Sequence, residues 1–350
     1  MRFRPFKYPA AAFLAHAHRL FLLTFTVVLL HVGGVARAEE IVCTGANLIA
    51  ELAEKDPHLL EKMKKEAAAI PNGEGLLWRV ERQGGAPSYL FGTMHVTDPR
   101  VTEPPEVAKT ALAGARTVVI ETTDILDRQT LMAAMLAKPE LMMFPTGESL
   151  TDHLSPEERK LVEEALEKRG IPLQSVVKTK PWLLVSLVSL PECELKRQQA
   201  GALVLDAKLA QDAKAAGKRV AGLETVEEQL SAMASLPMEL HMRGLVGALG
   251  LGDRMDDMIE TMIVLYEGGE TGMFRPALSG LLELGEEEAG DYAAFEETMV
   301  QMRNRIMAER AAPLLDEGGA FIAVGAMHLP GEGGIIELLR QAGYEVSRAD

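Results

Sequence analysis

Two histidines end nearly identical phrases that lie far apart in the chain: residues 88–95 read SYLFGTMH and residues 321–328 read FIAVGAMH. Each phrase is a short apolar run that stops at Gly-x-Met-His, and a run of this kind predicts a buried strand. The glycine lets the backbone turn or approach another group closely as the strand ends. Open α/β sheets bind their ligands at strand ends, so His95 and His328 are predicted to converge on one site if the two halves pack together.

Two glutamates stop apolar segments in the same way. Glu121 ends the run at residues 117–120, and Glu224 follows residues 218–223. A carboxylate in such a place is costly to bury unless it is paired, hydrogen-bonded or bound to a metal. This context favours a functional role for Glu121. For Glu224 the favoured alternative is an acid beside a helix that starts at Thr225.

Two imidazoles and one or two carboxylates form a ligand set suited to a divalent transition ion such as Zn²⁺, Mn²⁺ or Co²⁺. Such an ion would activate water and polarise a carbonyl group. Taken alone, either histidine would be better explained as a core or turn residue bonded to a backbone carbonyl, and only the repetition favours chemistry. His58, His153 and His241 lie in polar or helical contexts and are predicted to be surface residues.

Strands and helices alternate at both ends of the chain, which is the pattern of an α/β fold with a mixed sheet. A hairpin is predicted from residues 76–80 and 88–92, on either side of a Gly-Gly-Ala-Pro turn. Helices are predicted at residues 104–113, 203–217 and 335–342, and further strands at residues 117–121, 218–224, 320–324 and 344–346. Between these ends, residues of about 130–200 and 225–312 are predicted to form a helical insert.

The N-terminus has the features of a secretory signal peptide. Basic residues precede an apolar run at residues 20–32, and Ala36-Arg37-Ala38 offers the small residues that a signal peptidase reads. The run is short for a membrane span, which takes about 20 apolar residues, although a retained anchor is the alternative. Cleavage near Ala38 would leave residues 39–350 as one exported domain, periplasmic or secreted, without a stable membrane span.

Removal of residues 1–38 deletes five basic residues and no acidic ones, which moves the formal charge from −15 to −20. An acidic surface repels phosphate backbones, whereas nucleic-acid binding requires clustered Lys and Arg. Nucleic acid is therefore excluded as an expected partner.

The chain contains two cysteines, Cys43 and Cys193, and both remain after processing. In an oxidising compartment they are expected to form one disulfide between the N-terminal arm and the middle of the chain, with two buried free thiols as the alternative. With no other cysteine and no Cys-x-x-Cys pair, thiolate metal sites and dithiol redox chemistry are excluded.

Several phrases resemble the TraB/GumN family, which is related to the Tiki metalloproteases. They are residues 90–96 (LFGTMHV), 180–182 (KPW), 217–230 (GKRVAGLETVEEQL), 303–304 (RN), 324–331 (VGAMHLPG) and 338–344 (LLRQAGY). They occur in the expected order over nearly the whole mature chain. The resemblance implies two related halves around a mixed sheet, each of which contributes a strand ending in Gly-x-x-His to a single site.

The resemblance also implies roles for individual residues. His95 and His328 would be metal ligands and Glu121 a third ligand or general base; the pattern of carboxylates at strand ends adds Glu224 as a candidate fourth ligand. Arg303 would stabilise an oxyanion or bind a substrate carboxylate, unless it forms a surface salt bridge. Asn304 and Trp182 are candidates for substrate contacts, although Asn304 is equally explained as a polar residue on a helix face.

The leading hypothesis is therefore an exported metal-dependent hydrolase that acts on a peptide or protein. One alternative is a metal-independent ester or amide hydrolase, in which a histidine acts as general base and a glutamate orients it. The other is a non-catalytic protein that binds a peptide signal or haem, or that assists polysaccharide export. The sequence does not indicate the number of subunits.

Overall fold

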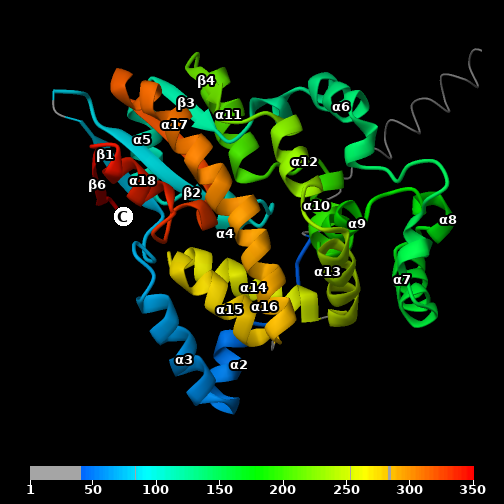
Figure 1. Cartoon of the computed structure of the whole chain (residues 1–350). Helices are drawn as coiled ribbons and strands as arrows, with labels where there is room; N and C mark the ends of the chain where they lie inside the picture. Colours follow the sequence, from blue (N-terminus) through cyan, green and yellow to red (C-terminus); the bar gives the residue numbers. More distant parts are fainter. Residues whose placement is uncertain (1–40, 83, 253, 283–284) are drawn as a thin grey trace, which may run out of the picture. The chain divides into compact units, whose positions relative to one another are not determined.

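A six-stranded sheet organises the protein, with the strand order β4-β3-β5-β2-β1-β6. The strands are β1 (Leu77–Glu81), β2 (Ser88–Thr93), β3 (Thr117–Ile120), β4 (Arg219–Gly222), β5 (Ala320–Gly325) and β6 (Glu345–Arg348). The computed structural model describes residues 41–350 except residues 83, 253 and 283–284, so the predicted signal peptide lies outside the described residues. Residues 43–350 form one compact unit (Figure 1).

The sheet is mixed, as predicted. Strands β4, β3, β5 and β2 run parallel to one another, whereas β1 is antiparallel to both β2 and β6. The predicted hairpin is confirmed in β1 and β2. The carboxyl ends of the four parallel strands meet at one edge of the sheet, where ligands bind in open α/β folds.

The two strands that carry the repeated phrase are direct neighbours. Strand β2 pairs with β5, so that Tyr89 lies opposite Phe321 and Thr93 lies opposite Gly325. Gly92 therefore faces Val324 rather than Gly325, and the two copies of the motif are offset by one residue.

Each face of the sheet is covered by its own core, because successive strand residues point to opposite sides. Phe321 packs in a cluster with residues of α5 (Glu106–Gly114), α11 (Leu205–Ala215), α14 (Arg254–Glu267) and α15 (Phe274–Leu281). Its neighbour Ile322 packs in a second cluster with residues of α17 (Met302–Glu317) and α18 (Ile335–Gln341). Figure 1 shows α17, in orange, lying across the strands.

Helices make up the two inserted stretches. The first contains α6 (Arg128–Ala137), α7 (Pro156–Lys168), α8 (Leu173–Val176), α9 (Pro181–Val188) and α10 (Glu192–Gln199). The second begins with α12 (Val226–Ala234) and α13 (Met238–Leu251) and continues through α14, α15 and α16 (Glu286–Glu296). Short helices α2 (Leu48–Lys55), α3 (Pro57–Ala68) and α4 (Pro99–Thr102) complete the set. A π-helical turn, Glu297–Gln301, leads into α17.

One histidine is not where the sequence suggested. His241 was predicted to lie on the surface, but only 4% of it is exposed, and its Nε2 lies 3.0 Å from the carbonyl oxygen of Met233. The prediction was wrong because α13 packs through Met242 and Leu245 into a third apolar cluster, which draws His241 into the interior. No helix in the described ranges is both long enough and apolar enough to cross a bilayer.

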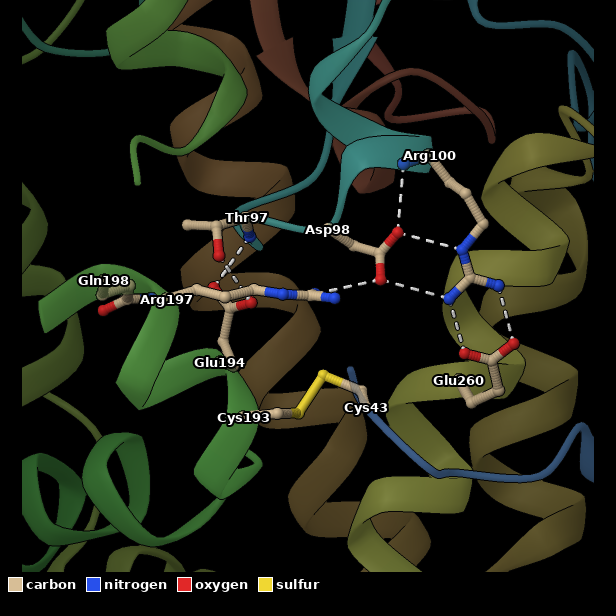
Figure 2. Close-up of a disulfide and its surroundings, with 9 residues drawn as sticks. All are labelled: Cys43, Thr97, Asp98, Arg100, Cys193, Glu194, Arg197, Gln198 and Glu260. Atoms are coloured by element: carbon tan, nitrogen blue, oxygen red, sulfur yellow. Dashed lines mark hydrogen bonds and ion pairs between the residues drawn. A yellow bond between two sulfur atoms is a disulfide. The ribbon is translucent and has the colours of Figure 1, made fainter. Parts of the chain in front are cut away.

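The predicted disulfide is confirmed. Cys43 and Cys193 are bonded, with their Cα atoms 5.4 Å apart, so the segment before α2 is joined to α10 (Figure 2). Glu194, the next residue of α10, accepts hydrogen bonds from the backbone N–H of Thr97 at 2.7 Å and from its hydroxyl at 2.9 Å. The cross-linked helix therefore holds the segment that directly follows His95.

Candidate active site

Four neighbouring parallel strands deliver one candidate residue each to the carboxyl edge of the sheet. Glu121 directly follows β3, Glu224 follows β4, His95 follows β2, and His328 ends the single 3-10 turn (Ala326–His328) after β5. The backbone N–H of Glu224 donates to the carbonyl of Glu121 at 2.7 Å, which places these two residues side by side.

Arg303, on α17, joins the two glutamates. Its Nη2 donates to Oε2 of Glu121 and to Oε2 of Glu224, each at 2.7 Å, and its Nε lies 3.1 Å from both oxygens of Glu224. All three side chains are buried. A buried charge requires a partner, and here one guanidinium compensates two carboxylates. Arg303 therefore forms a buried ion pair and not the surface salt bridge that was the alternative.

Gln229, on α12, is a further member of this cluster. Its amide nitrogen donates to Oε2 of Glu121 at 3.1 Å and to Oε2 of Glu224 at 3.4 Å. In the sequence Gln229 lies within a longer phrase and carries no assigned role. Its position three residues after the start of α12, which the Thr225 hydroxyl caps, offered no distinct chemical signal.

The motif glycines are needed because other groups approach their Cα atoms closely. The N–H of Gly325 donates to Oε1 of Glu121 at 2.8 Å, and a Cβ atom at this position would lie 3.2 Å from that oxygen. At Gly92 a Cβ atom would lie 2.8 Å from Cδ1 of Leu329. A larger residue at either position would require Leu329 or Glu121 to shift.

His328 is held in one orientation by Asn304. The Asn304 amide nitrogen donates to the carbonyl of Gly333 at 2.8 Å, which leaves its Oδ1 to accept from Nδ1 of His328 at 2.6 Å. When the ring is neutral, its proton is therefore on Nδ1 and the lone pair is on Nε2. That Nε2 lies 3.7 Å from Oε1 of Glu121.

Burial lowers the pKa of His328 to about 4, so the ring is neutral near pH 7. Burial acts in the opposite sense on the carboxyl of Glu121. The nearby charges of His328, His95 and Arg303 outweigh it and lower the pKa of Glu121 to about 2. A neutral imidazole thus faces an ionised carboxylate, and both have an electron pair available to an electrophile.

His95 is the open member of the site, with 59% of its side chain exposed. Its Nε2 lies 3.5 Å from Oδ2 of Asp206, a residue in the first turn of α11 that is only 3% exposed. Crowding by the surrounding protein opposes protonation of the ring, but the carboxyl of Asp206 and the charge of Glu121 raise the pKa of His95 to about 9. The charge of His95 in turn lowers the pKa of His328, so both histidines act within one electrostatic environment.

Asp206 was not predicted as a site residue. Residues 203–217 have the pattern of an ordinary amphipathic helix, in which an acid in the first turn needs no special explanation. The available signal was that Asp206 lies between Leu205 and Ala207, both of which are buried.

The donor atoms are spaced for a divalent ion in two pairs, and an ion bound to His95 would displace the proton that its raised pKa retains near pH 7. An ion with bonds of about 2.1 Å and tetrahedral angles spans ligand atoms roughly 3.4 Å apart. The separations of His328 from Glu121, at 3.7 Å, and of His95 from Asp206, at 3.5 Å, are close to this value. Within the part of the chain that the structure describes, no three His, Cys, Asp or Glu side chains are gathered closely enough to hold an ion as they stand.

Two other candidates have defined surroundings. Trp182, on α9, is buried, and its indole N–H donates to the carbonyl of Leu141 at 3.3 Å, within the first helical insert. Asn304 is buried as well, and both ends of its amide are used by Gly333 and His328. Substrate contact by either residue stays a prediction, as does metal ligation by Glu224.

Comparisons with known proteins find one matching family model and several relatives that are named metalloproteases. The model of the TraB/PrgY/gumN family matches residues 76–348. Metalloprotease TIKI1 of Xenopus tropicalis is 27% identical over 333 residues, which cover 81% of this chain and 63% of that protein. Metalloprotease TIKI1 of Homo sapiens is 27% identical over 321 residues, covering 78% of this chain and 61% of the relative. Metalloprotease TIKI2 of Xenopus tropicalis is 27% identical over 318 residues, which cover 77% of this chain and 59% of that protein.

The chain therefore spans about six-tenths of the length of these curated relatives. No solved structure matches the chain significantly.

Proposed function

This chain belongs to the TraB/PrgY/gumN family, and from that premise we propose that it is an exported metal-dependent hydrolase that cleaves a peptide or protein. The observation that carries the proposal is the pairing of His328 Nε2 with Glu121 Oε1, two electron-pair donors 3.7 Å apart at the carboxyl edge of a parallel sheet. The names of the relatives, metalloproteases TIKI1 and TIKI2, support the same reaction class.

In this proposal His328, Glu121 and His95 would hold a divalent ion, and the bound ion would supply an activated water and polarise a carbonyl group. Asn304 keeps the His328 ring turned so that Nε2 faces Glu121. Arg303 donates to one oxygen of the Glu121 carboxylate and the Gly325 N–H to the other, so the orientation of this carboxylate is fixed before substrate arrives. Substrate enters on the side of His95, because that side chain is the exposed one.

Glu224 and Arg303 have supporting roles in the proposal. Both oxygens of Glu224 accept from Arg303, so Glu224 positions the guanidinium instead of serving as the fourth ligand. Within the described residues the bonds of Arg303 to Glu121, Glu224 and Met299 employ four of its five N–H groups. The remaining N–H, on Nη1, is available to a developing oxyanion.

Metal content decides this proposal. Purified protein is analysed for bound Zn, Mn and Co, and its activity on a mixed peptide library is measured before and after a chelator and after metal is restored. His95→Ala combined with His328→Ala is expected to abolish both metal uptake and cleavage. His153→Ala is the matched control, since His153 pairs with Glu148 away from the site. Equal metal stoichiometry in wild type and the double variant would overturn the ligand assignment.

A metal-free hydrolase is the second candidate, and one observation favours it. Arg303 already compensates the charges of Glu121 and Glu224, which leaves less electrostatic attraction for a cation. A neutral His328 would then take up the proton of the attacking water. Cleavage that persists in chelator, and that is lost in His328→Ala, would support this candidate over the metal-dependent one.

Export to the periplasm is part of the proposal. The disulfide between Cys43 and Cys193 supports it, because disulfides persist in oxidising compartments. N-terminal sequencing of protein recovered from the periplasmic fraction is expected to begin near Glu39. Recovery of the full-length chain from the cytoplasm would contradict this part.

A further inference from the structure

We propose that Asp206 belongs to the metal site as the carboxylate paired with His95, and that it, rather than Glu224, completes the set of protein ligands. This inference rests on the proposed function. It adds a residue that no motif in the chain identifies.

The first support is the unequal use of the two carboxyl oxygens of Asp206. Oδ1 accepts a hydrogen bond from the hydroxyl of Thr93 at 2.9 Å, which fixes the rotation of the group. Oδ2 is buried and has no hydrogen-bond donor among the described residues. Its nearest charged partner is the His95 ring at 3.5 Å, and a buried oxygen without a close hydrogen bond is expected to have a nearer partner in the working protein.

The second support is the direction in which Oδ2 lies. It is 3.5 Å from Nε2 of His95, too far for a good hydrogen bond but close to the spacing of two ligands on one ion. Burial and the charge of Asp206 raise the pKa of the Tyr266 hydroxyl. This hydroxyl donates to the carbonyl of Gly92 at 2.9 Å and not to Oδ2 of Asp206. A cation between Asp206 and His95 would satisfy Oδ2.

The third support is the contrast with Glu224. Both oxygens of Glu224 accept from Arg303, and Oε2 lies 3.4 Å from the donor nitrogen of Gln229 as well. A cation on either oxygen of Glu224 would compete with Arg303, whereas Oε1 of Glu121 accepts from the Gly325 N–H and not from the guanidinium. At Asp206, by contrast, no hydrogen bond to Oδ2 has to break.

The test uses Co²⁺ as the probe, with affinity measured by competition against a chromophoric chelator and coordination followed by visible absorption. Asp206→Asn keeps the size of the side chain and an oxygen for the Thr93 bond. We expect it to weaken Co²⁺ binding at least about 100-fold and to change the absorption bands. Asp212→Asn, on the exposed face of the same helix, is expected to match wild type.

Two further variants separate a ligand from a merely structural residue. Thr93→Val frees Oδ1 without removing the carboxylate, and about a 10-fold loss of Co²⁺ affinity with unchanged bands is expected. Glu224→Gln is expected to leave the bands unchanged. Wild-type affinity and bands in Asp206→Asn, or altered bands in Glu224→Gln alone, would overturn the inference. Absence of Co²⁺ uptake by wild type would overturn the metal-dependent function itself, and the inference with it.

Discussion

The side-chain oxygen of Asn304 accepts a 2.6 Å hydrogen bond from Nδ1 of His328, and this contact decides which ring nitrogen faces Glu121. Asn304, on α17, therefore determines which nitrogen of His328 can act as a base or ligand. The sequence indicates only that His328 lies at the end of a strand. Both residues are buried, with 1% of Asn304 and 5% of His328 exposed, so few water molecules compete for this hydrogen bond.

Asn304→Leu is expected to lower kcat/KM by roughly 10–100-fold, because the ring loses the acceptor that holds its proton on Nδ1. Asn304→Asp retains an acceptor for Nδ1 but loses the bond to Gly333, and an intermediate loss is expected. Activity is measured on the best peptide from the library, with circular dichroism to verify folding. Full activity in a folded Asn304→Leu variant would show that the contact has no part in the reaction.

Arg303→Met is expected to reduce the free energy of unfolding by about 3–5 kcal/mol, since it leaves two buried carboxylates without a counter-charge. Adding Glu121→Gln and Glu224→Gln removes both charges and is expected to restore much of the loss. Urea unfolding of Arg303→Met, of the triple variant and of a control variant provides the measurement. Arg305→Met is the control, because Arg305 is exposed in its pair with Glu297 and should change stability by at most about 1 kcal/mol.

Cys43→Ser combined with Cys193→Ser is expected to lower the free energy of unfolding by up to about 5 kcal/mol. The bond closes a loop with a sequence separation of 150 residues, and it restricts the unfolded chain accordingly. Thermal unfolding with and without a reductant checks this expectation. The reductant should lower the Tm of wild type and leave that of the double variant unchanged; an equal effect on both would be inconsistent with a stabilising bond.

Asp98, shown in Figure 2, gives stability a dependence on acid pH. Burial raises the pKa of this carboxyl, but hydrogen bonds from Arg100 and Arg197 have the larger combined effect and the pKa is lowered. The unfolded chain, with a pKa of about 3.9, then binds the proton first as pH falls. The stabilisation is therefore complete well above about pH 4 and is lost as pH falls through the folded-state pKa.

Urea unfolding of wild type and Asp98→Asn over a series of pH values tests this dependence. The stability difference between the two proteins is expected to be constant near neutral pH and to shrink below about pH 4. A difference that persists unchanged into strong acid would mean that the charge of Asp98 is not responsible.

Much of the sheet could be predicted because each strand is a short apolar run bounded by turn residues, as in residues 88–92 and 117–121. The same rule located Glu121 and His328, since a polar residue directly after a buried strand lies at the sheet edge. The sequence could not predict that β2 and β5 would be neighbours, because strand order depends on packing between distant segments.

The residues that sequence reasoning missed all reach the site from helices. Asp206 and Gln229 lie near the starts of α11 and α12, where acidic and polar residues are common for local reasons. Arg303 and Asn304 were identified by resemblance. That Arg303 binds the two glutamates and Asn304 binds His328 follows from the face of α17 on which each residue lies. Local patterns do not specify such faces when the partner is a strand end far away in the chain.

The one-residue offset between Gly92 and Gly325 makes the repeated motif asymmetric. The two copies, GTMH and GAMH, differ at a single position, Thr93 against Ala326. The Thr93 hydroxyl anchors Asp206, whereas Ala326 packs where a Cβ on Gly92 would lie 3.2 Å away. Interchanging these two residues would remove an anchor on one side and crowd the strand end on the other. An internal repeat that reads as duplication has thus become two specialised parts that can no longer substitute for each other.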